Sequence, residues 1–368
     1  MQKRNLKVII SGGGTGGHVF PAIAIANKLK ERVENIDILF VGAQGKIEME
    51  KVPAAGYPIE GLWISGFQRK LTTRNLMFPI KLISSMLKSI KIVRRFKPDL
   101  VVGVGGFASG PLMRAAISKG VPAVIQEQNS FPGVTNRILA NKVEKICVAY
   151  DKMERFFPHE KIVFTGNPIR SEILNVPTSK DEASKFFDLK TYKKTILVVG
   201  GSLGAGTINR SIEKYLPLLI ENNLQLIWQT GKTNFTQAKE AVEKVNCPDI
   251  KVFDFINRMD LAYAMADIIV SRAGAIAVSE LCCVGKPVIL IPSPNVAEDH
   301  QTKNAKALLE KEAIIMIKDV EAIETLGEEL INLSKNEELQ AKMKVNISTL
   351  AVRDASDRIV DEILKIVK

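Results

Sequence analysis

The sequence predicts an α/β protein made of two doubly wound domains, each built around a parallel sheet. Three observations support this prediction. Short β-branched runs alternate with longer helical runs, this series occurs twice along 368 residues, and each series opens with a glycine-rich turn after its first strand. Uninterrupted apolar strands separated by helices are typical of parallel sheets that are covered on both faces. At roughly 150 residues per domain, the length favours two or three domains.

The expected strands define the two series. The first series has strands at residues 7–11, 37–41, 100–104, 123–126 and 145–149, and a short apolar run follows at 162–164. The second series has strands at residues 195–199, 225–229, 251–255, 268–270 and 288–291. Turn-forming residues at 166–168 and 176–178 are the candidates for the boundary between the series. Taking the earlier turn, we expect domains over residues 1–165 and 166–353. Isoleucines at helical spacing predict a closing helix over residues 354–368.

Composition and charge exclude several classes of protein. A hydrophobic content of 46% with 25% charged residues is typical of a folded globular chain. The four cysteines contain no C-x-x-C pair and fit a reducing cytosol, and only three histidines occur, which disfavours a disulfide scaffold, a zinc ribbon and a multi-histidine metal site. No signal peptide is recognisable. The uncharged stretch 8–27 contains five glycines and Pro21, so it predicts strand, loop and helix start instead of a membrane span.

Three glycine-rich loops follow expected strands, at residues 11–18, 103–110 and 200–206. In open parallel sheets, ligands bind at the carboxyl ends of strands, where glycine lets backbone N–H groups approach an oxyanion. The N-terminus of the following helix adds a favourable dipole. One such loop could be only a tight turn, but three in one chain predict phosphate ligands, with a diphosphate in each domain.

Two enzyme motifs occur in these loops without their usual context. The first loop satisfies G-x-G-x-x-G, but the strand at 37–41 does not end in the acidic residue that a dinucleotide site requires. Residues 200–204 satisfy the G-x-S-x-G of serine hydrolases. Asp299 and His300, however, are too close in sequence to supply the orienting role and the base role separately. No P-loop motif occurs.

Several polar residues are candidates for a site. His18 closes the first loop; it could be a simple helix-start group, but its place beside an expected diphosphate favours proton transfer. Glu280, in the helix after strand 268–270, could be a surface acid or could accept hydrogen bonds from a ribose diol. The amides of Gln301 and Asn304 could bind sugar hydroxyls. No D-x-D pair occurs to bind a divalent cation, so backbone amides, helix dipoles and Arg170 are expected to stabilise leaving-group charge.

Much of the net charge of +11 comes from one segment, because residues 69–97 contain nine Lys or Arg and no acidic residue. Helical spacing places Lys81, Lys88, Lys91 and Arg95 on one face, beside two apolar rows. A helix that only connects two strands and exposes a basic face to solvent needs fewer apolar residues than this segment has. The two apolar rows beside a basic face suit an anionic membrane surface, so we expect residues 74–97 to bind one. Nucleic acid is the rival partner, and the lack of an aromatic stacking array disfavours it.

Seven segments together resemble a known family. They are 13–21, 103–111, 127–129, 166–170, 200–205, 271–280 and 299–301, and they run in the family's order along essentially the whole chain. The chain is similar to the peptidoglycan N-acetylglucosaminyltransferases, which transfer N-acetylglucosamine from UDP-GlcNAc to the C4 hydroxyl of MurNAc in lipid I and so make lipid II. The resemblance implies the GT-B fold, with two Rossmann-like parallel-sheet domains, an interdomain cleft and a last helix, 354–368, that returns to the first domain. It also implies an inverting, metal-independent reaction without a cofactor, at the cytoplasmic face of the cell membrane.

The resemblance further implies site residues. His18 would be the catalytic base, and the loops with Gly13, Gly14, Gly105 and Gly106 would hold the lipid-linked diphosphate of the acceptor. The first domain would therefore bind acceptor and membrane, and the second would bind UDP-GlcNAc. Ser202 would contact the diphosphate, Ile256 the uracil, Glu280 the ribose and Gln301 the sugar. The implied substrate-binding positions are Thr15, Gly16, Gly17, Asn129, Arg170, Ser202, Ile256, Ala275, Ile276, Ala277, Val278, Ser279, Glu280 and Gln301.

Two residues depart from the family's pattern. Leu203 stands where the family usually has Gln, and Phe107 stands where many members have Tyr, so each removes a polar contact. Two other functions stay open at this point. One is another GT-B lipid glycosyltransferase, such as a diacylglycerol glycosyltransferase, and the other is a non-catalytic membrane protein that retains nucleotide-sugar binding.

Overall fold

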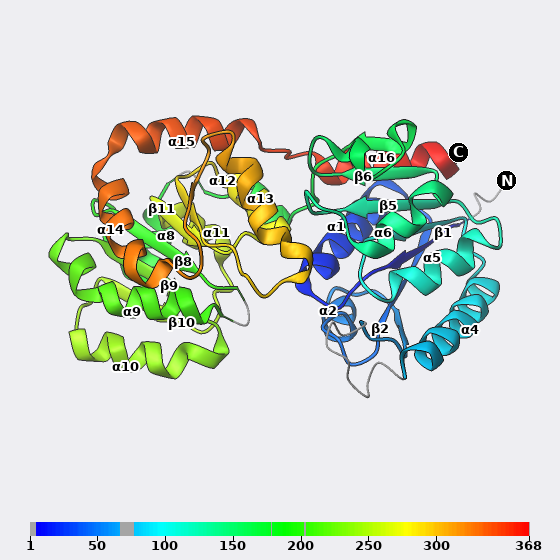
Figure 1. Cartoon of the computed structure of the whole chain (residues 1–368), viewed down its shortest axis with the longest axis horizontal. Helices are drawn as coiled ribbons and strands as arrows, with labels where there is room; N and C mark the ends of the chain where they lie inside the picture. The colour runs from blue at the N-terminus through cyan, green and yellow to red at the C-terminus, as the bar shows by residue number, and fades with distance from the viewer. Residues whose placement is uncertain (1–4, 67–76, 178, 202–203, 368) are drawn as a thin grey trace. The chain divides into compact units, whose positions relative to one another are not determined.

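The structure is a computed structural model that describes residues 5–66, 77–177, 179–201 and 204–367 (Figure 1). Contacts divide the chain into two units. Unit 1 runs up to Ile169 and resumes at Asp354, and unit 2 is Arg170–Arg353. Each unit contains its own parallel sheet, so the prediction of two parallel-sheet α/β domains is confirmed.

The sheet of unit 1 has seven parallel strands in the order β3-β2-β1-β4-β5-β6-β7. They are β1 (Leu6–Ser11), β2 (Ile36–Ala43), β3 (Ile59–Leu62), β4 (Leu100–Gly103), β5 (Ala123–Glu127), β6 (Lys145–Val148) and β7 (Ile162–Phe164). Ile9 is paired with Leu39 on one side and with Val101 on the other, so β1 is central. The order reverses between β1 and β4, which is where such sheets bind ligands. Sequence reasoning missed β3, because Glu60 and Gly61 interrupt a four-residue strand.

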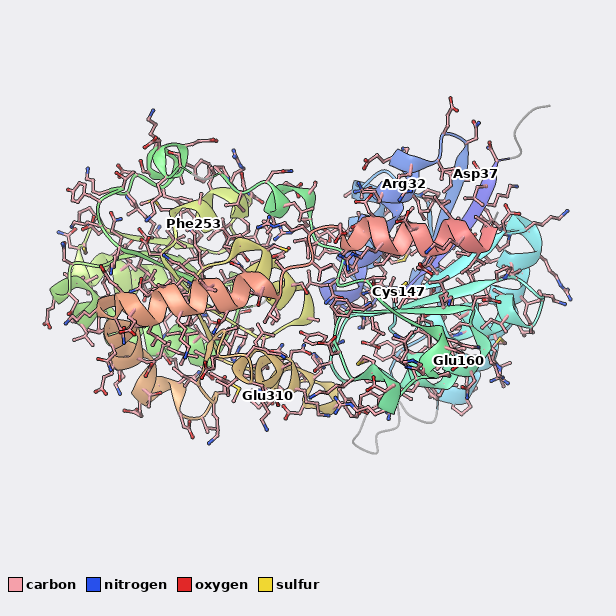
Figure 2. The ribbon with its side chains drawn as sticks, turned by 90° about the horizontal axis from the view of Figure 1, so that it is seen from above. Arg32, Asp37, Cys147, Glu160, Phe253 and Glu310 are labelled. Carbon is pink, nitrogen blue, oxygen red and sulfur yellow. The ribbon has the colours of Figure 1, made fainter. Side chains whose placement is uncertain are left out.

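Helices cover both faces of this sheet. They are α1 (Gly16–Arg32), α2 (Glu48–Ala54), α4 (Phe78–Phe96), α5 (Ser109–Ile117), α6 (Val134–Leu139) and α16 (Ala355–Val367), with short 3-10 turns at Ala140–Lys142, Met153–Arg155 and His159–Lys161. One apolar core joins α4, α5 and α6 to the sheet, and another joins α1 and α16 to its opposite face. Ile359 and Ile363 are fully buried there, and Arg32 lies beside α16, where it donates to Asp361 over 2.6 Å (Figure 2).

The sheet of unit 2 has six parallel strands in the order β10-β9-β8-β11-β12-β13. They are β8 (Thr195–Val199), β9 (Gln225–Gln229), β10 (Ile250–Phe253), β11 (Ile268–Ser271), β12 (Val288–Leu290) and β13 (Ile315–Met316). The strand expected at 251–255 ends earlier, at Phe253, and the two-residue β13 was not predicted because it is too short to show a period. The order reverses between β8 and β11.

The helices of unit 2 are α7 (Ser171–Leu174), α8 (Asp181–Phe187), α9 (Gly206–Glu221), α10 (Phe235–Val245), α11 (Met259–Met265), α12 (Ala275–Val284), α13 (His300–Leu309), α14 (Ala322–Lys335) and α15 (Glu337–Thr349), with 3-10 turns at Lys232–Asn234 and Ala297–Asp299. An apolar core around the fully buried Trp228 joins α9, α10 and α14 to the sheet. Within the described part of the chain, no helix is long and apolar enough to cross a membrane.

Candidate functional site

In unit 2, the glycine-rich loop at residues 200–206 connects β8 to α9. A Cβ atom at Gly204 would lie 2.2 Å from the carbonyl oxygen of Thr230, so no side chain fits at this position. Gly204 also has a φ of +83°, which favours glycine. The loop leads directly into the N-terminus of α9, which is oriented to attract an anion. Ser202 and Leu203 lie outside the described residues.

Arg170 and Glu280 meet in this unit. Glu280 lies in α12, is only 5% exposed, and accepts two hydrogen bonds from the Arg170 guanidinium. The buried Tyr263 of α11 lies close to this pair, so the Glu280 carboxylate acts electrostatically on its hydroxyl. Burial and the nearby Glu280 carboxylate raise the pKa of Tyr263, so its hydroxyl stays protonated. Sequence reasoning singled out Arg170 and Glu280 separately but missed Tyr263, which lies in an apolar helix.

The backbone of Ile256 is already partly engaged. Its N–H donates to the Oε1 of Gln229 over 2.9 Å, and both residues are buried. Gln229 ends β9, so the strand itself orients the residue that the sequence assigned to uracil. The N–H of Ile256 is therefore used within the protein.

Two further contacts shape the loops around α12 and α13. Gln301 accepts a hydrogen bond from the N–H of Ser293 over 2.8 Å. Asn304, fully buried, donates to the carbonyl oxygen of Ala273 over 3.3 Å, just before the residues Ala275–Ser279 that open α12. These two predicted amides thus contribute to loop structure, whatever else they bind.

Arg272 was not predicted as a site residue. It follows β11 and takes part in a hydrogen-bond network with Ile291, Asp319 and the first turn of α9. Its Nη1 donates to Asp319 over 2.5 Å and to the carbonyl oxygen of Ile291 over 3.0 Å. The other carboxylate oxygen of Asp319 accepts from Thr207 in the first turn of α9. Arg272 and Asp319 are both 16% exposed at the side chain, so this ion pair braces the carboxyl edge of the sheet.

In unit 1, the glycine-rich loops at residues 11–18 and 103–110 pack directly on each other. A Cβ atom at Gly106 would lie 2.2 Å from the carbonyl oxygen of Gly13. A Cβ atom at Gly105 would lie 3.0 Å from the Cε1 of His18. These close approaches explain why both loops need glycine, and they place His18 against Gly105.

Glu48 of α2 occupies part of the first loop. It is 1% exposed, and its two oxygens accept hydrogen bonds from the N–H groups of Gly14 and Ala43, both over 2.9 Å. The N–H of Gly14, in the loop expected to hold a diphosphate, is thus donated to an internal carboxylate. Thr15, Gly16 and Gly17 follow at the N-terminus of α1, whose first N–H groups have no partner within the helix.

The segment at residues 127–129 organises the region around His18. The Oε1 of Gln128 lies 2.9 Å from the Nδ1 of His18. The buried Glu127 accepts from the N–H of Asn129 over 3.0 Å and from the Nδ2 of Asn136 over 2.8 Å, and so orients Asn129. The segment was recognised in the sequence, but no role for Glu127 or Gln128 was.

The basic face of α4 is partly paired within the chain. Lys88 donates to the carbonyl oxygen of Gly61 over 2.6 Å, and Arg95 forms an ion pair with Glu60. Lys81 donates to Ser65 over 3.1 Å. Three of the four residues predicted to share this face therefore bond to β3 or to residues just after it. The outer side of α4 is apolar, since Ile80, Ile83 and Leu87 are 53%, 62% and 64% exposed.

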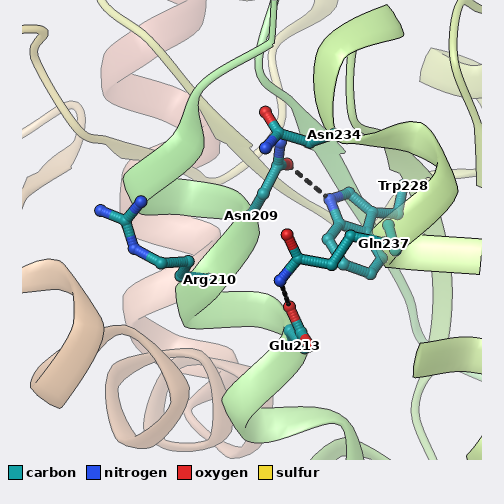
Figure 3. Close-up of a pocket in the computed structure, with 7 residues that line it drawn as sticks. Asn209, Arg210, Glu213, Trp228, Asn234 and Gln237 are labelled. Carbon is teal, nitrogen blue, oxygen red and sulfur yellow. Dashed lines mark hydrogen bonds between the residues drawn. The ribbon is translucent and has the colours of Figure 1, made fainter. Parts of the chain in front are cut away.

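A small pocket lies in unit 2 between α9 and α10 (Figure 3). Its volume of about 10 Å³ has room for about one water molecule. Trp228 donates to Asn209 over 3.0 Å and Gln237 donates to Glu213 over 2.8 Å at its wall. The pocket contains none of the predicted site residues. No three His, Cys, Asp or Glu side chains of the described residues gather into a group that could hold a metal ion.

Comparisons with known proteins cover both units. The glycosyltransferase family 28 N-terminal domain matches residues 8–148, and the glycosyltransferase family 28 C-terminal domain matches residues 195–359. A protein of Cytophaga hutchinsonii is 56% identical over 100% of this chain and 98% of its own length, and one of Christiangramia forsetii is 53% identical over 99% of both. Both are named UDP-N-acetylglucosamine–N-acetylmuramyl-(pentapeptide) pyrophosphoryl-undecaprenol N-acetylglucosamine transferase. Among solved structures, MurG of Acinetobacter baumannii is 29% identical with a TM-score of 0.79, over 98% of this chain and 99% of its own.

Proposed function

The chain belongs to glycosyltransferase family 28, and we propose that it transfers N-acetylglucosamine from UDP-N-acetylglucosamine to undecaprenyl-pyrophosphoryl-N-acetylmuramyl-pentapeptide. The observation that carries this proposal is the 56% identity to a transferase of that name across both units. The chain is therefore a hexosyltransferase, and its product is the lipid II of peptidoglycan synthesis. The diacylglycerol alternative has no comparable support.

In the donor site, Glu280 is the acceptor of hydrogen bonds from the ribose hydroxyls. A carboxylate has about four acceptor positions. Arg170 takes two of them, which leaves about two for the ribose hydroxyls. Both ribose hydroxyls can therefore bind Glu280 while Arg170 keeps its two bonds. The remaining N–H groups of the Arg170 guanidinium can donate to the diphosphate, whose leaving-group charge also benefits from the N-termini of α9 and α12.

In the acceptor site, the lipid-linked diphosphate binds the N-terminus of α1. Because Glu48 already accepts from the N–H of Gly14, the donors of this loop are those of Gly16 and Gly17, with Gly105 and Gly106 beside them. His18 follows directly in the same helix and is the base for the C4 hydroxyl of the N-acetylmuramyl sugar. The attack inverts the configuration at the anomeric carbon of the donor sugar.

The membrane partner is the anionic surface at the cytoplasmic face of the cell membrane, where the enzyme is peripheral. Support comes from α4, whose outer side exposes Ile80, Ile83 and Leu87 with the exposed Lys91 and Arg94 toward its C-terminal end. Apolar side chains insert at the headgroup boundary, and each nearby basic residue adds about 1 kcal/mol on an anionic surface. This arrangement does not suit a nucleic acid, which favours stacking aromatic side chains beside the basic ones.

The test is transfer of radiolabelled N-acetylglucosamine to a short-chain lipid I analogue, with EDTA present. We expect a disaccharide product with this acceptor and none with diacylglycerol. Formation of product that needs added magnesium would contradict the metal-independent mechanism, and no product under either condition would contradict the function. His18→Ala should abolish transfer. The matched control is His159→Ala, which removes an exposed histidine from a 3-10 turn of the same unit and should transfer normally.

A further inference from the structure

A buried row of side-chain amides leads from Asn167 to His18. Asn167 donates from Nδ2 to the carbonyl oxygen of Gln128 over 3.0 Å, so its Oδ1 is the atom that accepts from Gln126, over 2.9 Å. The Oε1 of Gln126 in turn accepts from the Nε2 of Gln128. Asn167, Gln126 and Gln128 are each at most 2% exposed. Every amide in the row is thus oriented by the one before it.

Backbone carbonyls hold Gln128 in this orientation independently of the row. Its Nε2 also donates to the carbonyl oxygens of Val104 over 2.9 Å and of Gln126 over 3.1 Å. Turning the amide over would press its oxygen against these two carbonyl oxygens, with no proton between them. A buried contact of this kind costs the desolvation energy of each unpaired group, about 1–3 kcal/mol. The Oε1 of Gln128 must therefore face His18.

That oxygen determines which nitrogen of His18 carries the proton. The Oε1 of an amide can only accept, and it lies 2.9 Å from Nδ1, so Nδ1 must be the donor. In the neutral ring the lone pair is then on Nε2. Histidine in water favours the opposite tautomer, so the protein has to select this one.

We propose that Gln128 is a positioning residue that fixes neutral His18 in the Nδ1–H tautomer and so makes Nε2 the base. The inference rests on the proposed function for what Nε2 does. There, the acceptor hydroxyl gives its proton to Nε2 while its oxygen bonds to the anomeric carbon of the sugar. The bond from that carbon to the β-phosphate oxygen breaks, and its electron pair leaves with UDP. The imidazolium later releases its proton to water.

Nitrogen NMR of ¹⁵N-histidine-labelled protein tests this without any substrate. The chain has only three histidines, and His18→Asn identifies the signals of His18 by their loss. We expect neutral His18 to have a protonated Nδ1 and an unprotonated Nε2 in the wild type. A proton on Nε2 would overturn the proposal, even if the protein is an active transferase.

The variant Gln128→Met removes the acceptor while keeping the side-chain length. It should shift His18 toward the Nε2–H tautomer and lower kcat by about a hundredfold, the scale of general-base catalysis, with KM for UDP-N-acetylglucosamine unchanged. Gln225→Met is the matched control. Gln225 is a fully buried glutamine of unit 2, and its amide bonds to the backbone of Lys190 in the same unit, so it is not connected to His18. It should leave the His18 spectrum and kcat as they are. If Gln128→Met left the His18 tautomer unchanged, the proposal would also be overturned. If the wild type gave the expected spectra but did not transfer the sugar, only the proposed function would be contradicted.

Discussion

Arg170 and Glu280 form a two-bond ion pair, with 2.9 Å between Nε and Oε1 and 3.1 Å between Nη2 and Oε2. The two residues are 110 positions apart in the chain, and each was expected to bind a different part of the donor. Because the two side chains are bonded to each other, a ligand that binds Glu280 changes which groups the Arg170 guanidinium can bind. Planar two-bond recognition of this kind is specific to arginine.

Glu280→Ala should weaken UDP-N-acetylglucosamine binding by about tenfold to a hundredfold, because charge-assisted hydrogen bonds contribute about 1.5–3 kcal/mol. Titration calorimetry measures the Kd. The control Asp188→Ala removes an exposed ion pair with Lys251 in the same unit and should change nothing. Equal losses of donor and acceptor affinity in Glu280→Ala would contradict the ribose role.

Tyr263→Phe should have a smaller effect of the same kind. It removes the hydroxyl beside Glu280 while the aromatic ring keeps its place in the core. The loss of one polar hydroxyl from the surroundings of Glu280 is about 1 kcal/mol, or about fivefold in Kd for the donor. If calorimetry gave the wild-type Kd, Tyr263 would be only a packing residue.

Replacing Ile83 and Leu87 of α4 by Glu should reduce binding to vesicles that contain phosphatidylglycerol. The change removes apolar side chains from the outer side of the helix and adds repulsion from an anionic surface. Vesicle sedimentation measures the bound fraction. Val345→Glu is the control, since Val345 is 65% exposed on α15 of unit 2. Wild-type sedimentation by the α4 variant would exclude α4 as the membrane contact.

Lys286 should make stability depend on pH. Burial lowers the pKa of its ammonium group from 10.5 to about 8, although the group donates to carbonyl oxygens of Tyr263 and Ala264 at the end of α11. Between about pH 8 and pH 10.5 the unfolded chain binds the proton that the folded chain has released, so stability rises with pH there.

In thermal unfolding, the Tm of the wild type should therefore increase relative to that of Lys286→Met as the pH passes through this range. The variant also loses the contacts to the carbonyl oxygens, which lowers its Tm by the same amount at every pH. Only the titration of Lys286 changes the slope of the Tm difference against pH, so the two effects can be separated. Lys232→Met, at an exposed lysine, is the control and should keep the wild-type slope. A constant difference in Tm between wild type and Lys286→Met would refute the lowered pKa.

Glu48→Ala should destabilise unit 1 and loosen its first glycine-rich loop. It leaves the N–H groups of Gly14 and Ala43 without their acceptor, at a cost of about 1–3 kcal/mol for each. Denaturant unfolding measures the loss. Glu50→Ala, at a highly exposed residue of the same helix, is the control. A Glu48→Ala protein as stable as the control would show that other groups satisfy these donors.

Most of the fold could be predicted because its signals are local. The apolar runs that became β1, β8 and β9 ended within a residue or two of their expected bounds. The exceptions, β3 and β13, are too short or too interrupted to show a period. In the site, family motifs singled out His18, Arg170 and Glu280, but not the residues that orient them.

By itself, the sequence determined the order of strands and helices, the glycine-rich turns between them and the family to which they belong. These features depend on neighbouring residues, whose spacing sets both backbone conformation and the apolar face. Only the tertiary structure decided which polar groups are paired. Gly14 is bonded to Glu48, Ile256 to Gln229 and His18 to Gln128, over separations of 34, 27 and 110 residues. Such bonds form when folding buries both partners together, because a buried donor or acceptor left alone is costly, and no local pattern encodes which partner it finds.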